Sequence, residues 1–179
     1  MSKIGLVILS AAALLTGCGS RGGQTSAEAK PTAAAELKDA QGGRVGIAKL
    51  TEAHDGVRVV LEITKLPPGT HGVHIHDVGV CEPPEFTSAG PHLNPFSKQH
   101  GSMNPRGPHA GDLGNIVIGA DGSGTLAATS PGTKLSGAGR DSLLREGGTA
   151  LVIHAAADDL KSDPAGNSGK RIACGVITR

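Results

Sequence analysis

Histidines are concentrated in one short stretch of the chain, HGVHIH, which spans residues 71–76. Successive side chains of a β-strand point to opposite faces, so His74 and His76 would share one face, with the intervening Ile75 on the other. Two neighbouring imidazoles on a rigid strand form half of a metal site. The alternative for this pattern alone is a polar, solvent-facing strand. His71 falls on the opposite face and is expected to pack rather than to bind a metal.

More candidate ligands follow in a region rich in Pro, Gly and Asn and near the end of the chain. They are His92, His100, His109, Asp112 and His154. Three imidazoles with one carboxylate suit tetrahedral zinc, whereas an all-imidazole set containing His74, His76 and His154 suits divalent copper. Two metals can also share one deprotonated ring, which offers a nitrogen to each. The alternative for each loop histidine singly is a solvated side chain, and His54, in a turn, is expected to be solvated.

The elements that must position these groups are predicted to be strands. The chain of 179 residues has no Trp or Tyr, only two Phe, and 28 Gly with 11 Pro. Runs such as VRVVLEI between turn residues predict an all-β sandwich or barrel with an aliphatic core. Alternation predicts eight antiparallel strands, at residues 36–40, 43–51, 56–66, 70–77, 113–118, 124–129, 150–155 and 172–178. Two long loops interrupt them, at residues 78–112 and before the last strand, and loops of such length are usually functional.

The first seventeen residues have the features of an export signal. Lys3 precedes an apolar run at residues 4–15, and the motif LTGC then ends at Cys18. This ending resembles a bacterial lipobox, which predicts an exported protein anchored to a membrane of the cell envelope by lipid on Cys18. An ordinary secretory peptide cut elsewhere is the alternative; the apolar run is too short for a transmembrane helix. Residues 18–35 are predicted to be a flexible tether, and residues 36–179 the folded domain.

Net charge limits the classes of binding partner, and cysteine content bears on a disulfide. Lys3 is the only charged residue before Cys18, so the mature chain carries sixteen basic and sixteen acidic residues. This balance predicts no nucleic acid or other polyanion as a partner. Cys81 and Cys174 then remain as an even pair in an exported protein, which predicts a disulfide; two buried free thiols are the alternative.

Six segments together carry a resemblance to a known family: HGVHIH, AGPHLNP, HG, PHAGDLGN, LVIHAAADDL and GNSGKRIACGVI. Their order and spacing resemble those of copper/zinc superoxide dismutases, in the bacterial exported form, over residues 36–179. The resemblance implies an eight-stranded Greek-key β-barrel. It also implies an enzyme that uses copper and zinc to convert superoxide to oxygen and hydrogen peroxide, protecting the cell envelope.

The resemblance implies a role for each candidate ligand. Copper would be held by His74, His76, His92 and His154, and zinc by His92, His100, His109 and Asp112. The shared His92 would bridge the metals as an imidazolate and shuttle a proton, and Arg171 would attract the anionic substrate; these two are the expected catalytic residues. Asp158 would hydrogen-bond one copper ligand and one zinc ligand. The Cys81–Cys174 disulfide would tie the metal loop to the last strand.

The sequence departs from the animal-type family pattern at two places. Ala165 stands where a hydroxyl residue precedes Gly-Asn, which affects the rim of the channel and not the metals. Cys81 follows His76 without a longer insertion, so no dimer interface is implied, and homodimer and monomer both remain open. Three lysines are candidates for wider attraction of the substrate: Lys134, Lys161 and Lys170. The alternative functions are a non-catalytic zinc- or copper-binding member of the fold and a metal-free scaffold domain.

Overall fold

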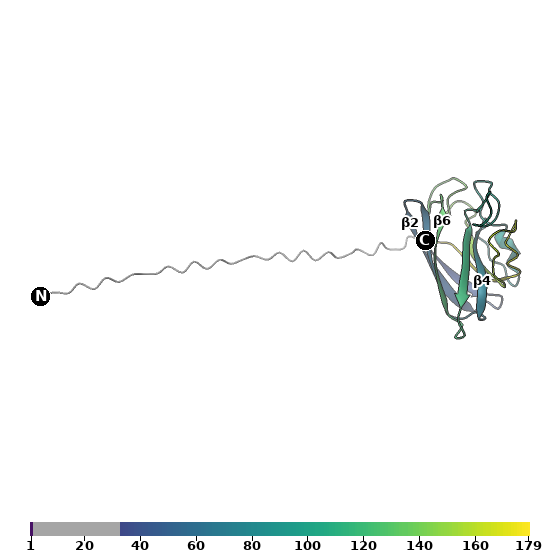
Figure 1. The fold of residues 1–179 in the computed structure, drawn as a ribbon, viewed down its shortest axis with the longest axis horizontal. Coiled ribbons are helices and arrows are strands. Elements are labelled where there is room, and N and C mark those ends of the chain that lie inside the picture. Colours follow the sequence, from purple (N-terminus) through teal and green to yellow (C-terminus); the bar gives the residue numbers. More distant parts are fainter. Residues whose placement is uncertain (2–32) are drawn as a thin grey trace.

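Eight strands and one short 3-10 helix make up the secondary structure of the described part of the chain, which comprises Met1 and residues 33–179 of this computed structural model. The strands are β1 (Ala33–Asp39), β2 (Arg44–Ala53), β3 (Gly56–Ile63), β4 (Gly69–His76), β5 (Asp112–Ile118), β6 (Gly124–Pro131), β7 (Ala150–His154) and β8 (Arg171–Val176), and the helix is η1 (Thr87–Ala89) (Figure 1). The predicted leader (apart from Met1), Cys18 and most of the predicted tether lie outside the described residues. Within the described residues, no helix has the length and hydropathy needed to cross a membrane.

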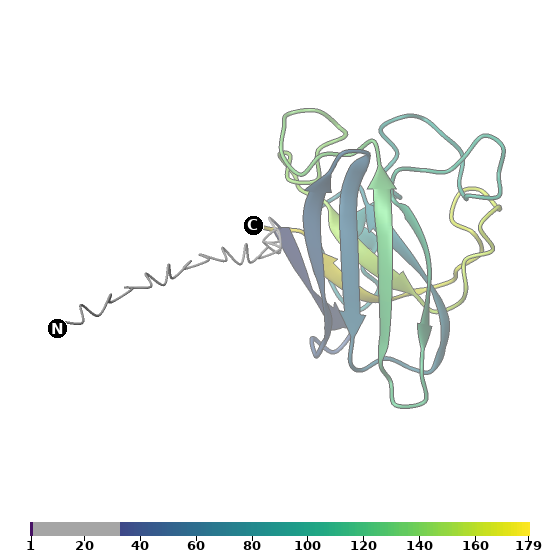
Figure 2. The same ribbon diagram turned by 60° about the vertical axis from the view of Figure 1, so that its left-hand side comes forward.

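The strands form one antiparallel sheet that curls into a nearly closed barrel. Their order is β5-β4-β7-β8-β1-β2-β3-β6, so the chain crosses over between β3 and β6, between β4 and β7 and between β1 and β8, as in a Greek key. A tight turn, closed by a hydrogen bond from Gly119 N–H to the Ser123 carbonyl, joins β5 to β6 and so brings the two ends of the order together. Figure 2 shows the barrel from the side of β1, β2, β3 and β6.

All eight predicted strands are present, with ends displaced by up to three residues. The largest displacements are at β1, which begins at Ala33 rather than at residue 36, and at β3, which ends at Ile63 rather than at residue 66. Along β3, buried Val57, Val59 and Leu61 alternate with outward-facing residues. Each fully buried aliphatic side chain of this kind contributes about 1.5–3 kcal/mol. The period-2 pattern therefore sets which face of each strand lines the core.

From His71 to His76, strand β4 is buried on both faces, which alternation alone does not predict. Val73 and Ile75 pack in the barrel core, while His74 and His76 point away from it and are still almost completely inaccessible. Residues 77–111 and 155–170 form the long loops that cover this outer face, and Figure 2 shows both loops, teal and yellow, on the same side of the barrel. They are bound to each other by a hydrogen bond from Met103 N–H to the Leu160 carbonyl. The barrel and its loops thus enclose the histidines between them.

The structure has a third long connection, residues 132–149, which the sequence pattern did not predict to be functional. Its Arg145 is mostly buried and donates to the side-chain carboxylate of Asp77 at 2.6 Å and to the Asp77 carbonyl at 2.7 Å. Asp77 directly follows β4, and its N–H donates to the Pro91 carbonyl. The connection therefore fixes the start of the loop that carries His92.

The predicted disulfide between Cys81 and Cys174 is confirmed. It joins the loop after β4 to strand β8 across 93 residues of sequence. Replacing both cysteines with serine is expected to lower the free energy of unfolding by about 4–5 kcal/mol, because the chain-entropy model assigns that stabilisation to a loop of this length. Denaturant unfolding of the oxidised protein and the double variant measures the difference. Equal unfolding midpoints would show that the crosslink does not stabilise the barrel.

Candidate metal centre

The predicted ligands come from four parts of the fold, three strands and one loop. His74 and His76 lie on β4, His154 ends β7, and Asp112 begins β5. The remaining three, His92, His100 and His109, lie in the loop of residues 77–111, which bridges back to the sheet where His76 pairs with His92. Strands therefore fix four of the side chains, and the loop has to bring three more to them.

The first group consists of four buried histidines, His74, His76, His92 and His154, whose ligand atoms all lie within 4.8 Å of one another. One ring nitrogen of each has no hydrogen-bond partner: Nδ1 of His74 and Nε2 of the other three. Buried polar atoms are nearly always paired, and leaving one unpaired costs about 1–3 kcal/mol. Four unpaired nitrogens that converge on one place therefore fit a nitrogen-ligated metal such as copper.

The second group surrounds one carboxylate oxygen, Asp112 Oδ1. Nδ1 of His92 and of His100 each lie 3.0 Å from this oxygen, and Nδ1 of His109 lies 3.3 Å from it without hydrogen-bond geometry. Bonds of about 2.0–2.1 Å to tetrahedral zinc separate neighbouring ligand atoms by about 3.3 Å. The donor set and its spacing therefore fit zinc. The set whose ligand atoms all lie within 4.8 Å of one another contains His74, and not His109, with His92, His100 and Asp112. Nε2 of His74 is held by Asp158, however, and its Nδ1 is one of the unpaired nitrogens of the first group.

Burial keeps three rings of the first group neutral, those of His76, His92 and His154. It lowers the pKa of His76 to about 2, with neighbouring His92 adding to the effect, and it lowers the pKa of His154 to about 3. The pKa of His92 falls to about 4 for the same reason, although its hydrogen bond to Asp112 opposes the shift. Neutral rings keep their lone pairs free, and a metal ligand needs those lone pairs.

The second nitrogen of each ring is anchored by the protein, which fixes the tautomer. Nδ1–H of His76 donates to the Gly90 carbonyl at 2.8 Å, and Nδ1–H of His154 donates to the Gly169 carbonyl at 3.0 Å. Metal-ligating histidines are held in this way, by a carbonyl or carboxylate on the nitrogen that faces away from the metal. The geometry therefore orients Nε2 of both rings toward the centre of the first group.

Asp158 connects the two groups, as the resemblance implies. Its Oδ2 accepts from Nε2–H of His74 at 2.7 Å, and its Oδ1 accepts from Nε2–H of His100 at 2.9 Å. Burial by itself would raise the pKa of Asp158, but the hydrogen bonds from His100 and His74 hold it below its usual range. An ionised carboxylate therefore orients one ring in each group.

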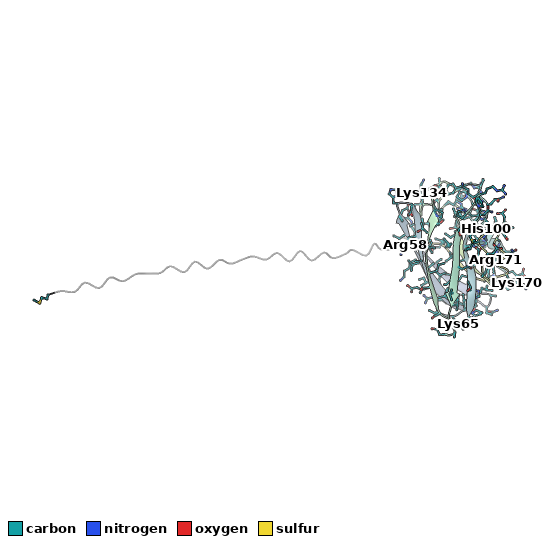
Figure 3. All side chains as sticks on the ribbon, in the orientation of Figure 1. Arg58, Lys65, His100, Lys134, Lys170 and Arg171 are labelled. Atoms are coloured by element: carbon teal, nitrogen blue, oxygen red, sulfur yellow. A yellow bond between two sulfur atoms is a disulfide. The ribbon has the colours of Figure 1, made fainter. Side chains whose placement is uncertain are left out.

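Arg171 begins β8 beside the first group. Its two terminal nitrogens donate to the Phe86 carbonyl at 2.6 Å and to the Gly90 carbonyl at 2.7 Å, and Gly90 is also the partner of His76. The guanidinium has five N–H donors, so three remain for an anion. Arg171 and Lys170 line a surface cavity of about 460 Å³, and Figure 3 shows both on the side of the molecule that carries His100.

Two histidines lie outside both groups. His71 is buried, and its ring nitrogens lie 2.9 Å from the His154 carbonyl and 3.0 Å from the Pro67 carbonyl, so it packs behind a candidate ligand. His54 is exposed in the turn between β2 and β3. Of the candidate steering lysines, Lys134 is paired with Asp141 at 3.2 Å and lies at an end of the barrel remote from Lys170 in Figure 3.

Sequence reasoning missed one residue of this centre, Asn115. Its side-chain amide pairs with the backbone of Asp158, although 43 residues separate them. Asn115 ends the segment PHAGDLGN, which carries the family resemblance, but an asparagine inside a strand does not by itself reveal a partner in a distant loop. Only the folded chain shows what the side chain contacts.

Zinc binding at neutral pH is expected to release about one proton from His100. Burial disfavours its protonated form, but hydrogen bonds to Asp112 and Asp158 outweigh burial and raise its pKa to about 9. Below that pH the ring carries a proton that a metal at Nδ1 must displace, so apparent zinc affinity should rise about tenfold per pH unit until about pH 9 and then level off. Calorimetric titration with zinc in buffers of different ionisation enthalpy counts the proton. Binding without proton release would contradict the prediction.

Comparison with known proteins gives a consistent result. Residues 43–177 match the family model for copper/zinc superoxide dismutase. The chain is 49% identical over 144 residues to superoxide dismutase [Cu-Zn] 1 of Aquifex aeolicus, covering 80% of this chain and 85% of that protein. A similar match, 43% identical over 148 residues, is the superoxide dismutase [Cu-Zn] of Caulobacter vibrioides, with 82% of this chain and 85% of that protein covered.

Solved structures agree with the sequence matches. A superoxide dismutase-like protein from Bacillus subtilis superposes with a TM-score of 0.75 at 39% identity, covering 80% of this chain and 96% of that one. The Cu/Zn superoxide dismutase of Brucella abortus superposes with a TM-score of 0.65 at 29% identity, covering 81% and 98%. The barrel, the grouped ligands and these matches show that the chain belongs to the copper/zinc superoxide dismutase family, whose members use copper and zinc to dismutate superoxide.

Proposed function

We propose that the chain dismutates superoxide in the cell envelope at a centre in which one imidazolate, that of His92, bridges copper and zinc. The copper ligands are His74, His76, His92 and His154, and the zinc ligands are His92, His100, His109 and Asp112. The observation that carries this assignment is the convergence of four buried ring nitrogens, all without partners, beside three others that surround Asp112 Oδ1.

The proposed bridge between the metals rests on the contacts of the two ring nitrogens of His92. Its Nδ1 lies 3.0 Å from Asp112 Oδ1 in the second group, while its Nε2 is unpartnered in the first. No other described histidine faces both groups in this way with both nitrogens. His92 is therefore placed to take up and return a proton at Nε2 while Nδ1 stays anchored beside Asp112.

The remaining residues bind and orient the substrate. Copper, when bound, supplies the one-electron chemistry that oxidises one superoxide to oxygen and reduces a second to peroxide. Arg171 holds a permanent positive charge next to His76 and offers N–H donors to a small anion. Lys170, on the same cavity, extends the positive field toward solvent. Superoxide is thus drawn to the face of the first group on which Arg171 lies.

The location is proposed from the leader sequence, LTGC ending at Cys18, which supports export and lipid anchoring. Labelling of growing cells with radioactive palmitate tests it: the wild-type chain should take up label and fractionate with membranes, and Cys18→Ser should do neither. Label on the Cys18→Ser chain would contradict the assigned anchor.

Metal analysis and superoxide decay test the function together. The full chain, reconstituted with copper and zinc, is expected to hold one of each and to accelerate superoxide decay, with a rate that falls as ionic strength rises. Zinc alone, without activity, would favour the non-catalytic alternative; a superoxide dismutase-like relative from Bacillus subtilis is among the matches. Binding of neither metal would overturn the ligand set.

A further inference from the structure

Asn115 makes two hydrogen bonds to the backbone of a single residue. Its side-chain Nδ2 donates to the Asp158 carbonyl at 2.9 Å, and its Oδ1 accepts from the Asp158 N–H at 2.8 Å. Asn115 lies on β5, three residues after Asp112, whereas Asp158 lies in the loop of residues 155–170. The Asn115 side chain on the barrel therefore makes the two hydrogen bonds to the Asp158 backbone that a neighbouring strand would make in a sheet.

The backbone it holds carries the carboxylate that hydrogen-bonds His74 in the first group and His100 in the second. Asp158 has no exposed side-chain surface, and neither do its partners His74 and His100. Its two oxygens are divided between them, Oδ2 to His74 and Oδ1 to His100. A small displacement of the Asp158 backbone would therefore lengthen hydrogen bonds to a ring in each group at once.

Backbone hydrogen bonds hold the neighbours of Asp158: Gly72 N–H donates to the Ala156 carbonyl at 2.9 Å, and Asp159 N–H donates to the Gly166 carbonyl at 2.8 Å. Gly166, at φ +62°, closes the opposite side: a Cβ there would overlap Asp158 Oδ1 and lie 2.6 Å from His100 Nε2. The Leu160 N–H also donates to Asp158 Oδ1, at 2.7 Å, but Leu160 belongs to the same loop and moves with it. Asn115 is thus the side chain that ties the Asp158 backbone to the barrel.

We propose that Asn115 is a positioning residue that couples the two metal sites through Asp158. The proposal rests on the ligand set proposed above and deepens it. Without the amide, Asp158 should lose its fixed place, and His74 in the copper set and His100 in the zinc set should lose their orientation together. A residue outside the ligand set would then affect the binding of both metals.

The test compares Asn115→Ala with Asn94→Ala. The Asn94 side chain makes the same kind of pair, to the Lys98 carbonyl at 2.8 Å and from the Lys98 N–H at 2.9 Å, in a loop segment that does not contact Asp158. Copper(II) electron paramagnetic resonance reports the first site, and the visible spectrum of cobalt(II) placed in the second site reports that one. Zinc affinity is measured by competition with a chromophoric chelator.

Asn115→Ala is expected to change both spectra and to weaken zinc binding by about 10- to 100-fold, the usual effect of losing a group that orients ligands. Asn94→Ala should leave the copper spectrum as in wild type. Asn115→Asp keeps the acceptor for the Asp158 N–H but sets an oxygen against its carbonyl, so it should change both spectra in the same direction. If the alanine variant does not fold, this second variant decides the question.

Two different failures are distinguishable. Wild-type copper and cobalt spectra in both Asn115 variants, or a change at one site only, would overturn the coupling through Asn115. A wild-type protein that does not bind copper and zinc would instead overturn the ligand set on which the inference rests.

Discussion

Replacing His74 with alanine is expected to abolish copper retention and to lower dismutase activity by more than about a hundredfold. Its Nδ1 is one of the four unpartnered nitrogens of the first group, and its Nε2 is held by Asp158. Losing even a group that orients a ligand typically costs about 10- to 100-fold in metal affinity or activity, so losing a ligand should cost more. The barrel should persist, because His74 points away from the core lined by Val73 and Ile75. Copper content by mass spectrometry and superoxide decay measure the two effects.

His54→Ala is the matched control. It removes an exposed imidazole from the turn between β2 and β3, so copper content and activity should equal those of wild type. Full activity in the His74→Ala variant would show that the proposed copper set is wrong. Circular dichroism of the variant separates loss of metal from loss of fold.

Arg171→Ala is expected to slow superoxide dismutation by about 10- to 100-fold and to flatten its dependence on ionic strength, while both metals stay bound. The change removes a fixed positive charge and its N–H donors from the cavity beside His76. Electrostatic steering changes association rates by about 10- to 1000-fold, and superoxide dismutase is itself an established example of it. Rates measured over a range of salt concentrations, with metal analysis of the same samples, check both parts.

Two further variants show which property of Arg171 matters. Arg171→Lys keeps the charge but not the planar set of donors, so it should fall between wild type and alanine. Lys134→Gln removes a positive charge that is paired with Asp141, remote from Lys170, and should leave the rate unchanged. Equal rates for wild type and Arg171→Ala would remove Arg171 from the mechanism.

The sequence by itself determined the strands and the pair of histidines on β4. Both follow from a property that each strand carries locally, the alternation of side chains between two faces. The eight strands were therefore predictable, and so was the shared face of His74 and His76. The ends of the strands were less predictable. Strand β3, for example, stops at Ile63 because residues 64–66 enter the turn that leads to Pro67.

The assignment of the loop histidines as ligands depended on the family resemblance, because no periodicity in the sequence connects them. His92, His100 and His109 lie in a segment without regular structure, and their approach to Asp112 is set by how the loop folds over the barrel. The sequence supplied the residue types that suit copper and zinc. It did not show which nitrogen of each ring is free.

The tertiary structure alone decided how the groups are held. The pairing of Asn115 with Asp158 and that of Arg145 with Asp77 join residues 43 and 68 positions apart. Such contacts depend on which strands become neighbours in the Greek key, and local sequence does not encode that directly. For the same reason the outer face of β4 reads as a polar strand face in the sequence, yet it is buried once two distant loops close over it.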